Sequence, residues 1–292
     1  MRRWITLAAA AIMISQAANG AGTGPVVKAP AGAVQGTMEG GMRIFRGIPY
    51  AQPPVGELRW RPPVPLKKWS GVRPAADFGA ACFQPVSKIA SVYTPAAPLP
   101  MSEDCLTLNV WAPAHAAKAP VFVWIHGGAL ATGSSREQMY DGRKLAERGM
   151  VVVSINYRLG VLGWLAHPEL SAENSDHLSG NYGLMDQIAA LRWIKDNIRS
   201  FGGDPSNVTI AGESAGALSV MFLMESPPAQ GLFHKAIAQS AYMITMPELK
   251  KAAFGQPSGE TVGTMLQGGL GAKGIGDMGA LAVISNRSPW WS

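Results

Sequence analysis

The segment GESAGA, residues 212–217, places a serine between two glycines. Gly-x-Ser-x-Gly is a weak signal alone, but between a strand and a helix it is typical of a nucleophile elbow, whose sharp turn lifts the serine hydroxyl above a sheet. Here the strand-like NVTIAG precedes Ser214 and the helix-like AGALSVMFLM follows it. We therefore predict that Ser214 is a catalytic nucleophile and that Gly212, Glu213 and Gly216 complete the elbow.

A second glycine motif, HGGA at residues 126–129, follows the apolar segment PVFVWI. A lone Gly-Gly pair is usually only a turn. Acyl transfer, however, needs an oxyanion hole, in which pre-aimed N–H groups stabilise the negative oxygen of the tetrahedral intermediate, each by about 3 kcal/mol. With the elbow downstream, we predict that the N–H groups of Gly128, Ala129 and Ala215 form this hole.

The elements that must position these groups alternate along the chain. Apolar strand-like runs and helix-like segments follow one another, which predicts an α/β fold with a mostly parallel central sheet flanked by helices. The strand-like runs cover residues 106–113, 120–128, 150–160, 207–212 and 234–241, and the helix-like segments cover 142–149, 181–201 and 215–226.

Longer motifs resemble those of a known family. FGGDPSNVTIAGESAG, residues 201–216, and EDCLTLNVWAP, residues 103–113, are similar to the two signatures of the type-B carboxylesterases, which have the α/β-hydrolase fold. The likeness runs from about Val34 to Ser240. It implies hydrolysis of a small-molecule carboxylic ester through an acyl-enzyme on Ser214. We expect no cofactor and no metal, since no set of His, Cys and carboxylates in the sequence has metal-ligand spacing.

The resemblance also implies structural roles for residues outside the elbow. It pairs Cys82 with Cys105 as a disulfide, and it makes ion pairs of Arg59 with Glu103 and of Arg158 with Asp186. Glu213 is then a structural, hydrogen-bonding carboxylate. Breaking one partner of a buried ion pair typically costs about 3–5 kcal/mol, so we interpret these pairs as scaffold.

The partners of Ser214 are harder to find. In this fold the triad order is Ser, then Asp or Glu, then His, and only Glu225 with His234 satisfies that order. Glu225 lies about 16 Å along the elbow helix at 1.5 Å per residue, and His234 precedes the next strand, at the wrong edge of the sheet. His126 belongs to the oxyanion loop and is a poor candidate base.

Three further histidines, His115, His167 and His177, lie in polar surroundings and should be solvated. Because the family's acid and histidine come from later strands, we expect this sequence to hold the N-terminal part of a longer hydrolase. We therefore expect the chain to have little activity by itself.

The N-terminus is typical of an export signal. A basic start and the apolar run at residues 5–14 precede small residues, so we assign residues 1–20 to a signal peptide and predict a secreted or periplasmic protein without membrane association after cleavage. The two cysteines fit an oxidising compartment, although two buried thiols are an alternative. Residues 21–254 form the hydrolase portion, and 255–292, with nine glycines, an irregular tail.

Two alternatives to an ester hydrolase remain open, and the composition disfavours a third kind of function. The net charge is +6, but the basic residues are scattered, which disfavours nucleic acid as a partner. A non-catalytic scaffold or binding protein on the same fold is possible, although such proteins have usually lost the serine. A serine peptidase on this fold explains EDCLTLNV and FGGDP less well.

Overall fold

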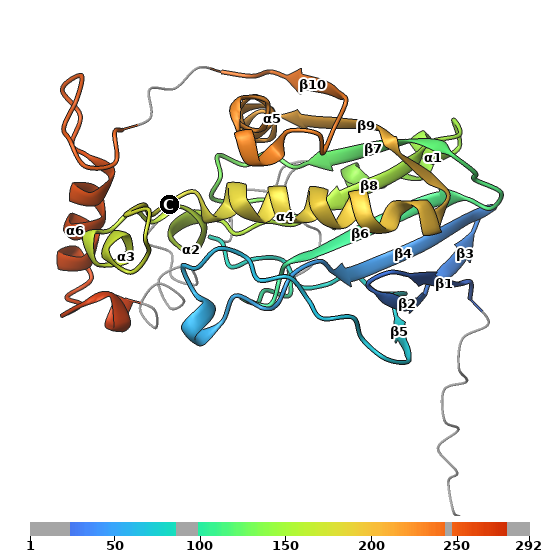
Figure 1. Ribbon diagram of the computed structural model, residues 1–292, viewed down its shortest axis with the longest axis horizontal. Helices are drawn as coiled ribbons and strands as arrows, with labels where there is room; N and C mark the ends of the chain where they lie inside the picture. The colour runs from blue at the N-terminus through green and yellow to red at the C-terminus, as the bar shows by residue number, and fades with distance from the viewer. Residues whose placement is uncertain (1–23, 86–98, 243–246, 279–292) are drawn as a thin grey trace, which may run out of the picture.

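The computed structural model describes residues 24–85, 99–242 and 247–278 (Figure 1). The predicted signal peptide, residues 1–20, lies outside these ranges. A seven-stranded sheet runs through the molecule in the order β10-β9-β7-β8-β6-β4-β3. Its strands are β3 (Thr37–Glu39), β4 (Met42–Pro49), β6 (Thr107–Pro113), β7 (Ala119–Ile125), β8 (Val151–Ile155), β9 (Gly203–Glu213) and β10 (Lys235–Gln239).

The sheet divides into a parallel and an antiparallel half. β10, β9, β7 and β8 run parallel to one another, whereas β6, β4 and β3 continue the sheet in antiparallel pairs. β8 is buried along its whole length, as expected for a Val/Ile-rich strand covered on both faces. The predicted α/β-hydrolase fold is confirmed, with parallel pairing on the side that carries Ser214.

Two helices lie against this sheet. Helix α4 (Tyr182–Asn197) buries ten of its residues, and α5 (Ala215–Glu225) packs on β9 and follows it directly. The segment expected to be helical at 142–149 forms only the single turn α1 (Arg143–Ala146). Gly142 lies so close to Trp111 that a Cβ there would be 2.8 Å from its ring, which fits a short element pressed onto the sheet.

Three short helices gather at one end of the sheet (Figure 1), and their apolar residues form a second, smaller cluster. It joins α2 (Gly160–Trp164), α3 (Pro168–Ala172) and α6 (Gly259–Gly269), and it includes Leu162, Leu170 and Leu266. α6 lies within residues 255–292, which we expected to form an irregular tail. ETVGTMLQ in this tail could start a helix, but we did not expect the glycines after it to continue one. Glycines cost helix stability, but here Gly263 permits a backbone approach to Ala166 in which any Cβ would clash.

Minor elements complete the described chain. β1 (Val26–Ala29), β2 (Gly32–Gln35) and β5 (Val72–Pro74) make a separate three-stranded sheet. Short 3₁₀ turns occur at Gly56–Leu58, Gln138–Tyr140, Ile198–Phe201 and Pro227–Ala229. No helix among the described residues is long and apolar enough to cross a bilayer.

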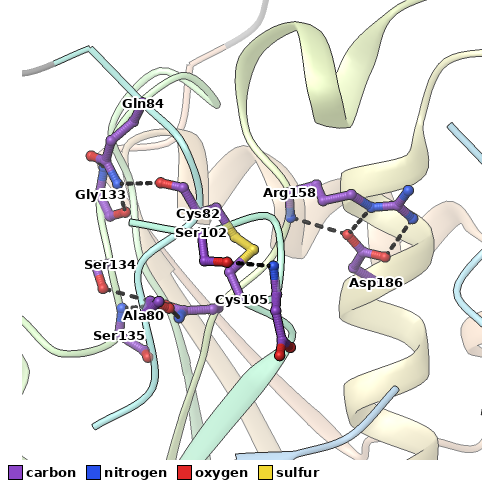
Figure 2. Close-up of a disulfide and its surroundings, with 12 residues drawn as sticks. Ala80, Cys82, Gln84, Ser102, Cys105, Gly133, Ser134, Ser135, Arg158 and Asp186 are labelled. Atoms are coloured by element: carbon purple, nitrogen blue, oxygen red, sulfur yellow. Dashed lines mark hydrogen bonds and ion pairs between the residues drawn. A yellow bond between two sulfur atoms is a disulfide. The ribbon is translucent and has the colours of Figure 1, made fainter. Parts of the chain in front are cut away.

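The expected covalent and ionic links are present. Cys82 and Cys105 form a disulfide, and Arg158 forms a bidentate pair with Asp186 at 2.7 and 2.8 Å that is almost fully buried (Figure 2). The Arg59–Glu103 pair is also bidentate, although both side chains are partly exposed.

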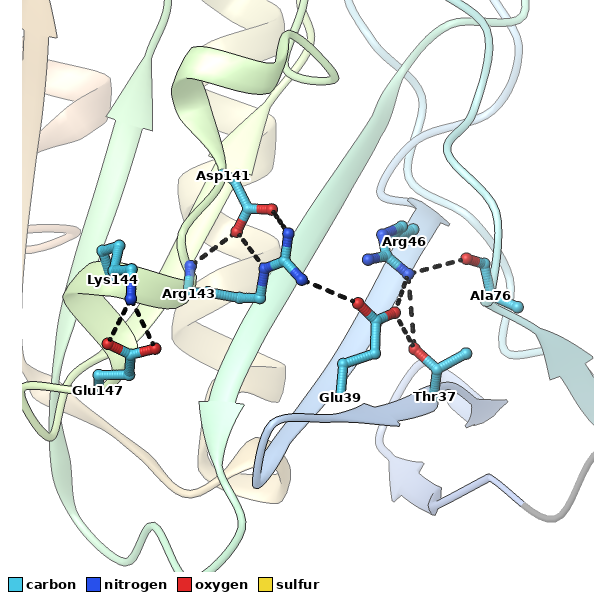
Figure 3. Close-up of polar contacts among 8 residues, drawn as sticks. All are labelled: Thr37, Glu39, Arg46, Ala76, Asp141, Arg143, Lys144 and Glu147. Atoms are coloured by element: carbon cyan, nitrogen blue, oxygen red, sulfur yellow. Dashed lines mark hydrogen bonds and ion pairs between the residues drawn. The ribbon is translucent and has the colours of Figure 1, made fainter.

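A surface network ties the antiparallel edge to the turn of α1 (Figure 3). Glu39 on β3 contacts both Arg46 of β4 and Arg143 of α1, and Arg143 also pairs with Asp141. Because Arg143 is 46% exposed and Asp141 29%, the pair between them contributes at most about 1 kcal/mol.

Candidate functional site

Ser214 lies where β9 ends and α5 begins, at the edge of the sheet to which the carboxyl ends of β7, β8 and β9 point (Figure 1). Its backbone has φ 55° and ψ −121°. Such a conformation costs a non-glycine residue about 1–3 kcal/mol and occurs mostly at functional sites. The predicted elbow turn is therefore present in the backbone at this residue.

The two elbow glycines permit close backbone contacts. A Cβ on Gly212 would lie 2.3 Å from the carbonyl carbon of Gly216, and a Cβ on Gly216 would lie 2.1 Å from the carbonyl oxygen of Ile125. The first contact lets the helix fold back over its strand, and the second brings the helix against the end of β7. A side chain at either position would prevent this packing.

The HGGA loop lies directly against the elbow. A Cβ on Gly127 would be 3.3 Å from the Cβ of Ser214 and 2.6 Å from the carbonyl oxygen of Glu213. The loop then turns tightly: Gly128 has φ 103°, Ala129 φ 55°, and the carbonyl of Gly128 accepts hydrogen bonds from the next turn. Glycine at 127 is thus required for the loop to approach Ser214.

The predicted oxyanion donors are available. Within the described part of the chain, the N–H groups of Gly128, Ala129 and Ala215 have no hydrogen-bond partner. Ala215 is the first residue of α5, an end at which free N–H groups and the helix dipole both favour negative charge. The N–H of Ser214 itself donates to the carbonyl of Gln239 on β10 at 3.0 Å.

His126 is buried and holds the loop. Its Nδ1 lies 2.8 Å from the carbonyl oxygen of Gly127, which can only accept, so Nδ1 carries the proton. The ring stacks on Tyr157 with centroids 4.5 Å apart, and the Tyr157 hydroxyl donates to the His126 carbonyl. Burial lowers the pKa of His126 to about 4. These contacts favour a structural role over that of a general base.

Polar side chains from distant segments fix the other end of the loop (Figure 2). The amide of Gln84 both donates to the carbonyl of Gly133 and accepts from its N–H, each at 2.8 Å. Asn156, after β8, accepts from the N–H of Ser135 and donates to the carbonyl of Ala80. Sequence reasoning missed both residues, because an isolated Gln or Asn carries no motif.

One half-buried carboxylate lies behind the loop. An oxygen of Glu137 accepts the N–H of Ser134 at 3.0 Å. Burial raises the pKa of Glu137 to about 7, although the hydrogen bond from Ser134 acts in the opposite direction. Glu137 therefore titrates near neutral pH.

Glu213, the last residue of β9, differs from expectation. We predicted a hydrogen-bonding carboxylate, but no described residue bonds to its side chain. Its carboxylate instead lies beside the loop, since a Cβ on Gly127 would be 3.3 Å from its Oε2.

The remaining acid and histidine candidates lie far from Ser214. His234 Nδ1 accepts the N–H of Val208, six residues before Ser214 on β9, which is about 20 Å along a strand at 3.3 Å per residue. Glu225 is exposed at the far end of α5. No described acid or histidine forms a hydrogen bond with the Ser214 side chain.

Of the three histidines that we expected in solvent, two are exposed and one is buried. His115 and His177 are exposed. The prediction for His167 is wrong: it is 2% exposed, its Nδ1 accepts the N–H of Glu169, and its Nε2 contacts Gln267 of α6. The partner comes from a segment 100 residues away, which the sequence around His167 could not indicate. In the described ranges no group of His, Cys, Asp or Glu could hold a metal.

A strained serine between a parallel strand and a helix, beside a glycine loop, defines an α/β hydrolase. The model of the carboxylesterase family matches residues 23–262, and the chain belongs to this family.

Similar proteins agree with this assignment. The chain is 43% identical to the fumonisin B1 esterase of Sphingopyxis macrogoltabida over 261 residues, which cover 87% of this chain and 45% of that protein. It is 47% identical to the para-nitrobenzyl esterase of Bacillus subtilis (strain 168) over 234 residues, which cover 79% and 46%. A solved PNB esterase matches with a TM-score of 0.76 and 40% identity over 90% of this chain and 51% of that one. The chain thus spans about half the length of these relatives.

Proposed function

We propose that the protein is a carboxylic-ester hydrolase that acts on a small-molecule ester through an acyl-enzyme on Ser214. The observation that carries the proposal is the elbow: a serine in a strained turn, with the unpartnered N–H groups of Gly128, Ala129 and Ala215 on the two backbone segments that meet there. The relatives named above are an esterase of fumonisin B1 and one of para-nitrobenzyl esters.

In the first step Ser214 Oγ attacks the ester carbonyl carbon, and a general base removes the hydroxyl proton. The carbonyl oxygen becomes an oxyanion that accepts from the N–H groups of the loop and of Ala215. The alcohol then leaves with a proton, and water hydrolyses the acyl-enzyme to release the acid. In this proposal the described residues supply the nucleophile and the donors, but no described acid or histidine forms a hydrogen bond with the Ser214 side chain.

Without a base among the described residues, we expect a low rate of ester hydrolysis. Without triad partners, an oxyanion hole and binding alone leave about 10³–10⁴-fold acceleration over water. We therefore propose that this chain by itself turns over esters slowly. A turnover like that of intact esterases, lost in Ser214→Ala, would contradict this.

The nucleophile is tested by reaction with an alkyl fluorophosphonate, followed by peptide mass spectrometry. Because no base is placed beside Ser214 among the described residues, labelling should occur slowly at this residue, and it should disappear in Ser214→Ala. Ser206→Ala, on an exposed part of the same strand, is the matched control and should label normally. A folded protein that stays unlabelled would favour the non-catalytic scaffold, which the absence of a nearby base among the described residues also supports.

We further propose that the mature protein is secreted or periplasmic. The export-type N-terminus and the disulfide support this, because disulfides persist in oxidising compartments. Cell fractionation with an antibody tests it, and retention in the cytoplasm with the N-terminus uncleaved would refute it.

A further inference from the structure

The HGGA loop packs against the backbone of the segment that follows it. A Cβ on Gly133 would lie 2.4 Å from His126 Nδ1 and 2.7 Å from the carbonyl oxygen of Gly127. The carbonyl of Gly128 accepts the N–H of Thr132 at 2.9 Å, and a Cβ on Gly128 would be 2.3 Å from the carbonyl oxygen of Thr132. Because the two segments are in such close contact, a displacement of the second segment must also move the loop that carries the proposed oxyanion donors.

Three side chains hold this second segment in place. Two of them, Gln84 and Asn156, are neutral amides that bond to the backbone on either side of Ser134 (Figure 2). The third, Glu137, holds Ser134 itself: its carboxylate accepts the Ser134 N–H at 3.0 Å, and its own N–H donates to the Ser134 carbonyl at 3.3 Å. Of the three side chains, only Glu137 can change its charge.

An ionised Glu137 has no cation beside it. In the part of the chain that the structure describes, no residue forms an ion pair with its carboxylate. The guanidinium of the neighbouring Arg136 donates to the carbonyl of Gly79 and lies 5.8 Å from the ring centroid of Phe78. Burial therefore raises the pKa of Glu137 to about 7, although the hydrogen bond from Ser134 lowers it. The charge behind the loop thus changes within the neutral range of pH.

The charge of Glu137 also acts on a residue that bonds to the loop. Tyr157, two residues after β8, donates its hydroxyl to the carbonyl of His126. Burial above all raises the pKa of Tyr157, and electrostatic interactions with Tyr140, Tyr242 and Glu137 raise it further. Burial also keeps His126 neutral, with its pKa lowered to about 4. An ionised Glu137 therefore opposes negative charge next to the loop, and it should oppose an oxyanion there in the same way.

We propose that Glu137 is a positioning residue that transmits its ionisation state through Ser134 to the HGGA loop, so that the oxyanion hole is weaker when Glu137 is charged. A neutral carboxyl holds the Ser134 N–H through its carbonyl oxygen and places no charge behind the loop. The link to catalysis rests on the proposed function, but the response of the loop to Glu137 does not need a reactive Ser214. The two effects can therefore be measured separately.

The response of the loop is measured from the amide ¹H–¹⁵N signals of Gly127 and Gly128 between pH 5.5 and pH 8.5. These signals should shift with a midpoint near the pKa of Glu137, about 7. Glu137→Gln keeps an oxygen that accepts the Ser134 N–H but cannot ionise, so it should abolish the shift. Glu147→Gln removes a carboxylate at an exposed position of the following turn; it is the matched control and should titrate like the wild type. Signals that do not titrate, or that titrate equally in Glu137→Gln, would overturn the proposal.

The effect on the oxyanion hole is measured from the rate at which an alkyl fluorophosphonate labels Ser214. The ratio of the rate in Glu137→Gln to that in the wild type should be about one at pH 5.5 and about two to ten at pH 8.5, as expected for removal of one nearby charge. Glu147→Gln should give a ratio of about one at both pH values, since its exposed charge is screened by solvent.

A ratio for Glu137→Gln that stays constant across this range would refute the effect on the oxyanion hole. If neither protein were labelled at any pH, the catalytic role of Ser214 would be refuted, and the amide titration would still decide whether Glu137 acts on the loop.

Discussion

At the scale of single residues, Glu137 should have the clearest pH-dependent effect on the stability of the folded protein. Its pKa is raised from 4.5 to about 7 by burial, so the folded protein holds a proton that the unfolded chain releases above pH 4.5. Its contribution to stability is therefore most favourable at low pH and is lost as pH rises through the window from about 4.5 to 7.

Glu137→Gln should remove this dependence, since the amide oxygen can still accept the N–H of Ser134. The variant should gain stability relative to wild type between pH 5 and pH 8, by about 1–2 kcal/mol after allowance for solvent screening. Urea unfolding at the two pH values checks this. Glu57→Gln, at an exposed position, is the control, and an equal pH effect there would contradict the assignment to Glu137.

The buried ion pair provides a second prediction at residue scale. Asp186 accepts three hydrogen bonds from Arg158, including one from its backbone N–H. Asp186→Ala leaves the guanidinium buried and unpaired, which should cost about 3–5 kcal/mol. Glu147→Gln breaks the exposed pair with Lys144 and should cost less than about 1 kcal/mol. If urea unfolding gave comparable losses of stability for the two variants, burial would not determine the contribution of the Arg158–Asp186 pair.

At the scale of elements, the elbow depends on glycine at its turn. Gly212→Ala places a methyl group 2.3 Å from the backbone of Gly216. The strand–helix junction must then open, so we expect labelling of Ser214 to be lost and stability to fall by about 2–3 kcal/mol. Gly268→Ala, on the exposed face of α6 with nothing within 4 Å of the added carbon, should instead stabilise by about 0.5–1 kcal/mol. Normal labelling of Gly212→Ala would contradict the steric argument.

Patterns of apolar residues predicted the elements that position the site. The strands β6 and β7 and the helices α4 and α5 lie within a few residues of their expected ranges, and β8 ends five residues before its expected end, because their apolar residues are buried in the core. β10 also forms where it was expected, although all five of its residues are exposed. β9 begins at Gly203, four residues before the expected Asn207, since Gly203 pairs with Ala119 across the sheet. Such pairing is set by the neighbouring strand and not by the local sequence.

What sequence reasoning missed depends on contacts between distant segments. Gln84 and Asn156 fix the oxyanion loop from positions 49 and 21 residues away. α6 forms despite its glycines because it packs on α2 and α3, which supply the stability that helix propensity does not. The motif residues were identifiable because their chemistry constrains their neighbours along the chain.

At the scale of the whole molecule, β10 ends the sheet in the described part, and all five of its residues are exposed. Such an edge invites aggregation, since unpaired strand groups are a template for another chain. Ile237, 42% exposed, adds apolar surface there.

Ile237→Lys should therefore reduce concentration-dependent self-association, as charged residues protect edge strands. Sedimentation velocity over a range of concentrations measures the effect. Phe254→Lys is the control, because Phe254 is 86% exposed but lies outside the sheet. An equal reduction in both variants would indicate general hydrophobic association without a role for the strand edge.

The hydrogen bond from the Ser214 N–H to the Gln239 carbonyl connects the strained turn to this outermost strand. When β10 frays, the Ser214 amide loses its acceptor, so its proton becomes free to exchange with solvent. Deuterium uptake at Ser214 should therefore follow the opening of β10, while the amides of β8, in the interior of the sheet, exchange far more slowly. The outermost strand thereby sets how long the candidate nucleophile keeps its backbone geometry.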